Sequence, residues 1–243
     1  EAAPLNAERL QLMGRAVRRI QALAALSFVD LLVVQPSIEQ PNRPQFVSAD
    51  GRIVLQVVTR TTWDLYAELT LNAAQSEMLS SSMGEFSYAA GHYRNPLDPG
   101  VLGIWAPVRL TDRYAYGPVG MAIVQSLDEQ LLLMRWPDKD HPTTPGEDMI
   151  NRLFIDQFAQ SHGHGTAALA AILQYLYERR ARAAYAKRDS SLLLRTVRLE
   201  VFAANTQAVQ TYERLGFVVH GDTGELYKMR LELGVPEPAP DLG

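Results

Sequence analysis

The chain has 243 residues, of which 47% are hydrophobic, 21% charged and 8% aromatic, a balance typical of folded globular proteins. Its formal net charge of −4 argues against nucleic acid as the main partner and favours a neutral or cationic one. Because the chain contains no cysteine, disulfides, thiolate metal sites and cysteine nucleophiles are excluded.

Residues 1–50 are expected to form an N-terminal helical extension followed by a proline-rich linker. Apolar side chains recur at three- and four-residue spacing from Leu10 to Ala24, which predicts a helix over 4–26. We expect this helix to pack on the main domain, with the arm of a homodimer as the alternative. The linker ends at Asp50-Gly51, a favourable turn pair that indicates the domain boundary.

The hydropathy pattern predicts no membrane partner. The most apolar run, 20–34, is too short and too polar to span a bilayer comfortably. We expect a cytoplasmic location, although a chain that begins at Glu1 instead of methionine can have lost a targeting peptide.

The main domain is expected over residues 51–233, where predicted strands and helices are mixed. Strands are predicted at 52–59, 102–110, 118–125, 150–155, 194–202, 217–220 and 226–233. Helices are predicted at 62–71, 75–83, 166–180 and 206–215. The basic run 179–189 is expected to be flexible, and the tail 234–243 disordered. This pattern indicates an α/β or α+β domain around a central sheet.

A glycine-containing loop joins the strand that ends at Ile155 to the helix that begins at Thr166. The first N–H groups of a helix have no partners within it, and the helix dipole favours negative charge there. Glycine also lets backbone N–H groups approach a phosphate closely. The loop therefore predicts an anion site, with a tight strand-to-helix turn as the alternative.

Three motifs follow one another in the second half of the chain. They are Gln160-x-x-Gly163-x-Gly165, then Asn205-x-x-Ala208-x-x-x-Tyr212 with Gly216-Phe217 shortly after, and the closing strand Tyr227-Lys228-Met229-Arg230-Leu231. Over residues 52–233 this combination resembles the GNAT superfamily of acetyl-CoA-dependent N-acetyltransferases. The strand sequence Arg152-Leu153-x-Ile155-Asp156 is most similar to the polyamine and diamine acetyltransferase branch.

The resemblance implies a central, twisted, mixed and mostly antiparallel sheet with helices on both faces. In the family, this sheet is split between two strands, here 150–155 and 194–202, and the pantetheine arm of coenzyme A enters the gap. Acetyl-CoA is therefore the expected co-substrate.

The resemblance also implies which residues bind the cofactor. Backbone N–H groups of the loop would hold the pyrophosphate, and the preceding strand would pair with the pantetheine arm. An N–H near Phe154 or Ile155 would polarise the thioester carbonyl. Asn205 would bind the cofactor or fix its own loop, and a helix N-cap role is compatible with this. The expected set is Leu153, Phe154, Ile155, Gln160, Ser161, His162, Gly163, His164, Gly165, Thr166 and Asn205.

Tyr212 matches the family's tyrosine beside the thioester sulfur. A phenol is a sensible general acid for a leaving thiolate, because both groups have pKa values well above neutrality. The alternative is a core aromatic on an amphipathic helix. The implied reaction has one step, in which an uncharged amine attacks the acetyl thioester and the thiolate leaves.

The general base and the acceptor site are less defined. In some polyamine acetyltransferases a glutamate removes the amine's proton, but the matching position here is Asn151. Glu147 and Asp148 lie just upstream, and Glu77 and Glu85 lie where the family's acceptor-shaping helices occur. Such carboxylates are more commonly solvated surface groups than bases. The candidate acceptor contacts are Glu85, Tyr88, Glu147 and Asn151. His92 and Tyr93, in the same segment as Glu85 and Tyr88, are further candidates.

His162 and His164 lie within the loop. If protonated, they would assist phosphate binding, and acetyl-CoA affinity would weaken between about pH 6 and 8. A metal is the alternative, but without a cysteine or an evident carboxylate partner we expect none.

The resulting expectation is an N-acetyltransferase for a primary amine of a small molecule, with polyamines as the first candidates. One alternative keeps the chemistry and changes the acceptor to an aminoglycoside-like drug, an amino acid or a protein N-terminus. Another is a non-catalytic sensor or interaction module that binds acetyl-CoA.

Overall fold

The computed structural model describes seven parts of the chain, namely residues 46–48, 52–58, 66, 69–71, 100–110, 113–126 and 145–233. The predicted N-terminal helix, the helix at 75–83, the tail at 234–243 and the acceptor candidates Glu85 and Tyr88 lie outside these residues. The described elements belong to two compact units, one within 36–194 and one at 195–233.

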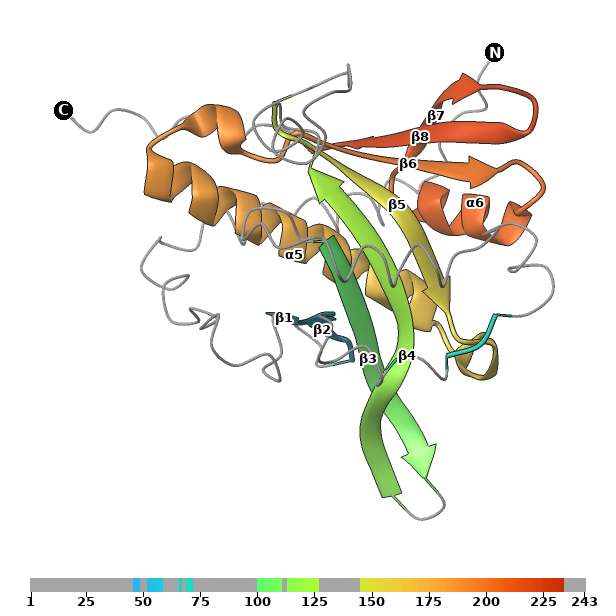
Figure 1. The fold of residues 1–243 in the computed structure, drawn as a ribbon. Helices are drawn as coiled ribbons and strands as arrows, with labels where there is room; N and C mark the ends of the chain where they lie inside the picture. The colour runs from blue at the N-terminus through green and yellow to red at the C-terminus, as the bar shows by residue number, and fades with distance from the viewer. Residues whose placement is uncertain are drawn as a thin grey trace. The chain divides into compact units, whose positions relative to one another are not determined.

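The first unit contains a five-stranded antiparallel sheet in the order β1-β2-β3-β4-β5 (Figure 1). Its strands are β1 (Phe46–Val47), β2 (Val54–Val57), β3 (Gly100–Leu110), β4 (Arg113–Ser126) and β5 (Glu147–Ile155). One row of paired residues crosses four of them, from Leu55 through Ile104 and Gly120 to Ile155. The start of β2 and the end of β5 therefore lie at the same end of the sheet, measured along the strands.

All four strands predicted in this unit are confirmed, but three of them are longer than expected. Strand β4 begins at Arg113, five residues before its predicted start at 118, so the hairpin of β3 and β4 extends to the pair Leu110 and Arg113. The aromatic residues Tyr114 and Tyr116 favour a strand, and in β4 they pair with positions of β3. Phe46–Val47, within the predicted linker, forms a short strand that pairs with β2.

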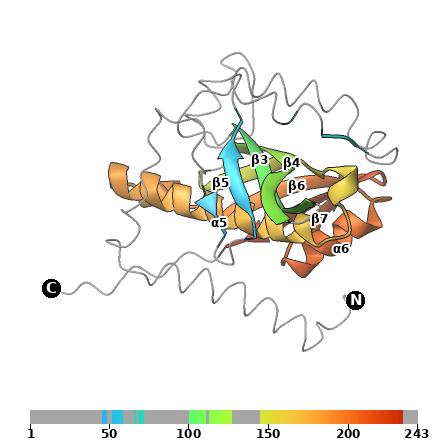
Figure 2. The same ribbon diagram turned by 90° about the horizontal axis from the view of Figure 1, so that it is seen from below.

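Helix α5 (His164–Lys187) covers one face of this sheet, as seen from below in Figure 2. It buries Leu169, Ile172 and Leu176, and the ring of Tyr175 lies 6.3 Å from that of Phe46 in β1. The helix extends seven residues beyond its predicted end at 180, so the expectation of a flexible basic run was wrong there. Alanine and arginine are strong helix formers, which explains why the run stays helical.

A buried ionic cluster joins α5 to β4 and β5. The guanidinium of Arg180 donates to the carboxylate of Asp148, to the hydroxyl of Ser126 and to the carbonyl of Glu147. The side chain of Asp148 is fully buried and also lies 3.5 Å from Arg179. The expectation that Glu147 and Asp148 are solvated surface groups was therefore wrong, because β5 begins at Glu147 and both residues are buried.

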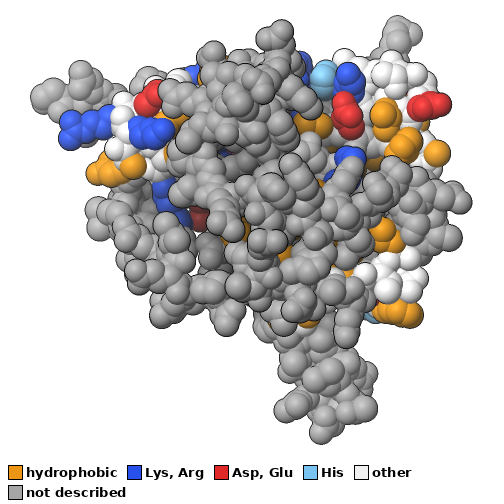
Figure 3. Space-filling view, viewed as in Figure 1, with side chains coloured by type: hydrophobic (Ala, Val, Ile, Leu, Met, Phe, Trp, Pro, Cys, Tyr) orange, Lys and Arg blue, Asp and Glu red, His pale blue; other side chains and the backbone are white. Residues whose placement is uncertain are grey.

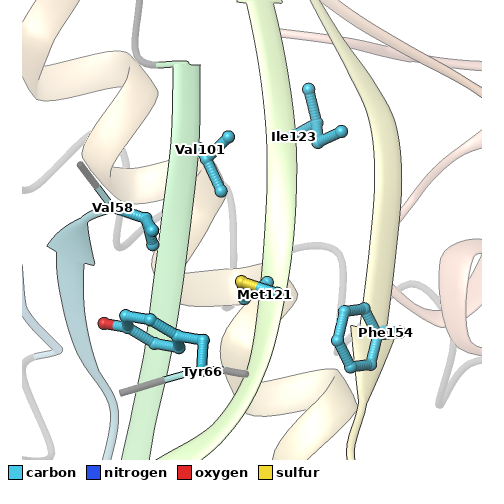
Figure 4. Packing of buried hydrophobic residues seen from close by; sticks show 6 residues of the cluster. All are labelled: Val58, Tyr66, Val101, Met121, Ile123 and Phe154. Carbon is cyan, nitrogen blue, oxygen red and sulfur yellow. The ribbon is translucent and has the colours of Figure 1, made fainter. Parts of the chain in front are cut away.

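A hydrophobic cluster lies across β3, β4 and β5 and includes Phe154 (Figure 4). Its most polar member, Tyr66, is fully buried, accepts a hydrogen bond from Trp105 Nε1 at 2.7 Å and donates to Gln56 at 3.1 Å. Residues 69–71 are not helical, so the predicted helix at 62–71 does not reach Leu71. The cluster consists of Val58, Tyr66, Val101, Met121, Ile123 and Phe154.

The second unit contains three antiparallel strands in the order β6-β8-β7 and one helix. They are β6 (Thr196–Phe202), α6 (Thr206–Arg214), β7 (Val218–Asp222) and β8 (Leu226–Glu232), which confirms every element predicted there. Gly216 follows α6 with a φ of 96°, the left-handed conformation in which glycine commonly ends a helix. Basic, acidic and apolar side chains are interspersed on the part of this unit that faces the viewer in Figure 3.

The predicted α/β architecture with mostly antiparallel strands is confirmed. Within the described residues, no helix combines the length and the apolar character needed to cross a membrane.

Candidate active site

The side chains at the end of β5 are used for packing. Phe154 lies in the hydrophobic cluster, and Ile155 lies against the first turn of α5, where its Cγ1 would be 3.7 Å from a Cβ at Gly165. Both side chains are buried. Any contact of these two residues with a cofactor therefore belongs to their backbone, as expected for a strand that pairs with an extended ligand.

A short 3₁₀ turn, η3 (Gln157–Ala159), leads from β5 into the loop, and Asp156 holds it in place. One carboxylate oxygen of Asp156 accepts the N–H of Phe158 at 2.9 Å, and the other accepts the N–H of Thr70 at 2.7 Å. The side-chain amide of Gln160 donates to the carbonyl of Ile155 at 3.0 Å. The motif glutamine thus closes the loop onto the strand, and Asp156 is a positioning residue that the sequence analysis did not identify.

The loop backbone has two left-handed residues before the helix. Ser161 has a φ of 65° and Gly163 a φ of 77°, and Gly163 is the N-cap of α5. A non-glycine residue at positive φ is uncommon, and such strain is concentrated at functional sites. Left-handed residues alternating with right-handed ones make backbone concavities that bind anions.

The helix itself leaves N–H groups available at this point. The N–H of Ala167 makes the first bond of the helix, to the carbonyl of Gly163 at 3.1 Å. The N–H groups of His164, Gly165 and Thr166 precede it, so no earlier helical carbonyl can accept from them. The structure therefore brings together, in one unit, the strand end, the strained loop and a helix N-terminus that the sequence predicted.

The two histidines of the loop stack on each other, with ring centroids 5.9 Å apart. Nδ1 of His162 lies 2.6 Å from the carbonyl oxygen of Gln160. Burial, followed by the nearby His162 and Arg52, lowers the pKa of His164 below its ordinary value. His164 is therefore neutral at neutral pH in the free protein. Among the described residues, no group of three His, Asp or Glu side chains is arranged to hold a metal.

Asn151 is the extra residue of a β-bulge in β5. Ile123 of β4 pairs with Arg152, and Val124 pairs with Ile150, so Asn151 has no partner position in β4. Its side-chain amide donates to Gln125 Oε1 at 2.8 Å. Bulges are over-represented beside active sites, because they bend a strand and redirect a side chain.

Glu147, the other acceptor candidate in β5, lies far from the loop. It is eight residues before Ile155, a distance of about 26 Å along a strand. It is also almost fully buried beside the ionic cluster. The structure does not bring Glu147 together with the loop.

In the second unit, Asn205 and Tyr212 lie at the start and near the end of α6. Asn205 Oδ1 accepts the N–H of Ala208 at 3.2 Å, which makes Asn205 the N-cap of this helix, one of the two roles expected for it. The ring of Tyr212 lies 5.9 Å from that of Phe217. Burial raises the pKa of Tyr212 to about 12.

Residues 73–217 match the family model described as Acetyltransferase (GNAT) family. The chain belongs to the GNAT family of acetyltransferases. The family assignment rests on a match over more than half of the chain, and it includes β3 to α6 with both loop and helix motifs.

Individual relatives of this GNAT chain are more distant. A mycothiol acetyltransferase of Mycobacteroides abscessus is 32% identical over 120 residues, which are 48% of this chain and 36% of that protein. A probable spermine N(1)-acetyltransferase of Bacillus subtilis subsp. natto is 29% identical over 107 residues, which are 44% of this chain and 62% of that protein. The chain thus matches less than two thirds of the length of either relative.

A solved structure, spermidine N-acetyltransferase from Vibrio cholerae in complex with CoA and spermine, is 14% identical and gives a TM-score of 0.49. The similarity covers 75% of this chain and 96% of that one.

Proposed function

We propose that this protein transfers the acetyl group of acetyl-CoA to a primary amine of a small molecule, with polyamines as the first candidates. The observation that carries the proposal is the strained loop between β5 and α5. Its left-handed Ser161 and Gly163 and the N–H groups that begin α5 form a backbone anion site at the end of a strand, in a chain that belongs to the GNAT family. Such a site suits the pyrophosphate of coenzyme A.

In this proposal the end of β5 positions the thioester. The backbone of Leu153, Phe154 and Ile155 pairs with the pantetheine arm, and one of its N–H groups polarises the acetyl carbonyl. Thr166, in the first turn of α5, completes the phosphate contacts with its N–H. Asn205 shapes the start of α6 as its N-cap.

Tyr212 acts on the leaving thiolate, and its raised pKa defines how. With a pKa of about 12 the phenol stays protonated throughout the neutral range, so it can always donate a hydrogen bond. A thiol such as cysteine has a pKa of about 8.5, so complete transfer of the phenol proton to the thiolate is uphill in this environment. The phenol therefore contributes mainly by donating a hydrogen bond to sulfur as negative charge develops there.

No strong base occupies the position of the family's glutamate, because an amide side chain does not accept a proton at neutral pH. Asn151 donates its amide to Gln125, which leaves Asn151 Oδ1 able to accept a hydrogen bond from an incoming amine. The amine's proton then leaves through water, so we expect turnover to rise with pH toward the pKa of the acceptor amine.

Tyr212→Phe tests the proposal directly. We expect the release of free thiol from acetyl-CoA in the presence of an amine to fall about 10²- to 10³-fold, the usual contribution of one hydrogen-bond donor to developing negative charge. Acetyl-CoA affinity should be nearly unchanged, because the ring and its packing on Phe217 remain. The measurement is steady-state thiol release together with calorimetric binding of acetyl-CoA.

The acceptor panel also separates the alternatives. Spermine and spermidine should be compared with an aminoglycoside, an amino acid, a peptide N-terminus and the thiol-containing acceptors suggested by the mycothiol relative. Tight cofactor binding without turnover of any acceptor would contradict the enzyme proposal and support a non-catalytic acetyl-CoA sensor.

A further inference from the structure

Arg52, two residues before the start of β2, lies beside the loop although the two are distant in sequence. Its Nη2 would be 3.7 Å from a Cβ built on Gly163. The sheet explains this proximity, because Leu55 and Ile155 belong to the same row of paired residues. Arg52 is three residues before Leu55, so it lies at the end of the sheet where β5 ends.

The charge of Arg52 reaches the loop. Together with burial and His162, it lowers the pKa of His164. Arginine keeps its charge at every pH relevant to a protein, whereas this histidine is neutral at neutral pH. Arg52 therefore supplies a permanent positive charge beside the loop, which His164 does not.

A cation beside the N-terminus of a helix is electrostatically unfavourable by itself, because that end of the helix dipole is also positive. An anion between the two reverses the sign, since it is attracted by both. Guanidinium groups bind phosphate oxygens with two parallel N–H donors, which gives a fixed geometry as well as charge.

We infer that Arg52 binds the pyrophosphate of the cofactor from the side opposite the loop backbone and so completes the cofactor site. The inference rests on the proposed function, since it assumes that the loop holds coenzyme A. It adds a cofactor contact from outside the motifs that carry the family resemblance, from a residue just before β2.

The test compares Arg52→Gln, Arg52→Lys and Lys187→Gln with the wild type. Lys187→Gln removes an equal charge at the far end of α5, about 35 Å from the loop at 1.5 Å per helical residue. Each protein is titrated with acetyl-CoA and with 3′-dephospho-CoA in a calorimeter at two salt concentrations. Circular dichroism and the thermal midpoint show whether each variant is folded.

For Arg52→Gln we expect an affinity loss of about 10- to 100-fold, the usual range for a charge-assisted hydrogen bond, and a weaker salt dependence. The loss should be the same for both ligands, because 3′-dephospho-CoA retains the pyrophosphate. Arg52→Lys should lie between the wild type and Arg52→Gln, and Lys187→Gln should bind as the wild type does.

A folded Arg52→Gln variant with wild-type affinity would overturn the inference and leave the proposed function intact. A loss seen with acetyl-CoA and absent with 3′-dephospho-CoA would also overturn it, because the partner would then be the 3′-phosphate. Wild-type protein that binds neither ligand would instead overturn the proposed function.

Discussion

At the scale of single residues, the environment of His164 changes the pH dependence expected from its sequence position. A histidine with its ordinary pKa would lose its charge, and with it some cofactor affinity, between about pH 6 and 8. Burial, His162 and Arg52 lower the pKa of His164, so its protonation belongs to a more acidic range.

We therefore predict that acetyl-CoA affinity is nearly constant above pH 7 and increases only below about pH 6.5, where His164 gains its proton. His164→Gln should remove that increase without weakening binding at pH 8. Calorimetric titrations from pH 5.5 to 8 measure both. A loss of affinity centred near pH 7 that persists in His164→Gln would assign the effect to another group.

At the scale of elements, the ionic cluster of Asp148 and Arg180 connects α5 to two strands. One of them is β5, the strand that ends at the loop. Buried ion pairs contribute little net stability when intact, but removing one partner leaves an uncompensated buried charge. Exposed ion pairs differ, because they contribute at most about 1 kcal/mol to the free energy of unfolding.

Asp148→Asn should therefore lower the free energy of unfolding by about 3–5 kcal/mol, because the guanidinium of Arg180 stays buried opposite a neutral amide. Urea denaturation followed by circular dichroism measures the change. Arg230→Gln is the matched control, since Arg230 forms an exposed pair with Glu232 at 3.3 Å. Equal effects of the two substitutions would show that the buried cluster has no special role.

The loop shows how one element depends on several others. Asp156 ties its first turn to Thr70, and Gln160 ties its middle to the end of β5. Gly163 then begins α5, whose burial under the sheet holds the helix N-terminus at a fixed place. The proposed anion site is therefore organised before any ligand arrives, which lowers the entropic cost of binding.

At the scale of the whole molecule, each unit contains a tyrosine whose pKa is raised. Burial raises the pKa of Tyr66 and of Tyr212 to about 12, whereas a tyrosine in the unfolded chain ionises near 10. The folded state thus favours the neutral phenol. This stabilisation is fully present below pH 10 and is lost as the pH rises toward 12.

We predict that the free energy of unfolding falls between pH 10 and 12, by up to about 1.4 kcal/mol per pH unit for each of the two tyrosines. Urea unfolding at a series of alkaline pH values, with phenolate absorbance as a second signal, measures the slope. Tyr212→Phe should reduce the slope. An unchanged slope in Tyr212→Phe would contradict the prediction.

Local patterns in the sequence were enough for the order of the strands and helices and for the motif loop. Periodic apolar residues specify a helix or a strand within a few residues. The conformation of a glycine at a helix start likewise does not depend on residues far away in the chain. The errors came where a neighbour decides the outcome. For example, β5 begins at Glu147, three residues before its predicted start, where the carbonyl of Glu147 accepts a hydrogen bond from Arg180 of α5.

By itself, the sequence determined the membership of the chain in an α/β acetyltransferase family and the place of the motif loop between β5 and α5, because those depend on short, contiguous spacings. Tertiary structure decided the electrostatics of that loop. Only the pairing of β2 through β3 and β4 to β5 places Arg52 beside Gly163, and burial, with His162 and Arg52, lowers the pKa of His164. Charge and desolvation act through space, so residues far apart in the chain set them together.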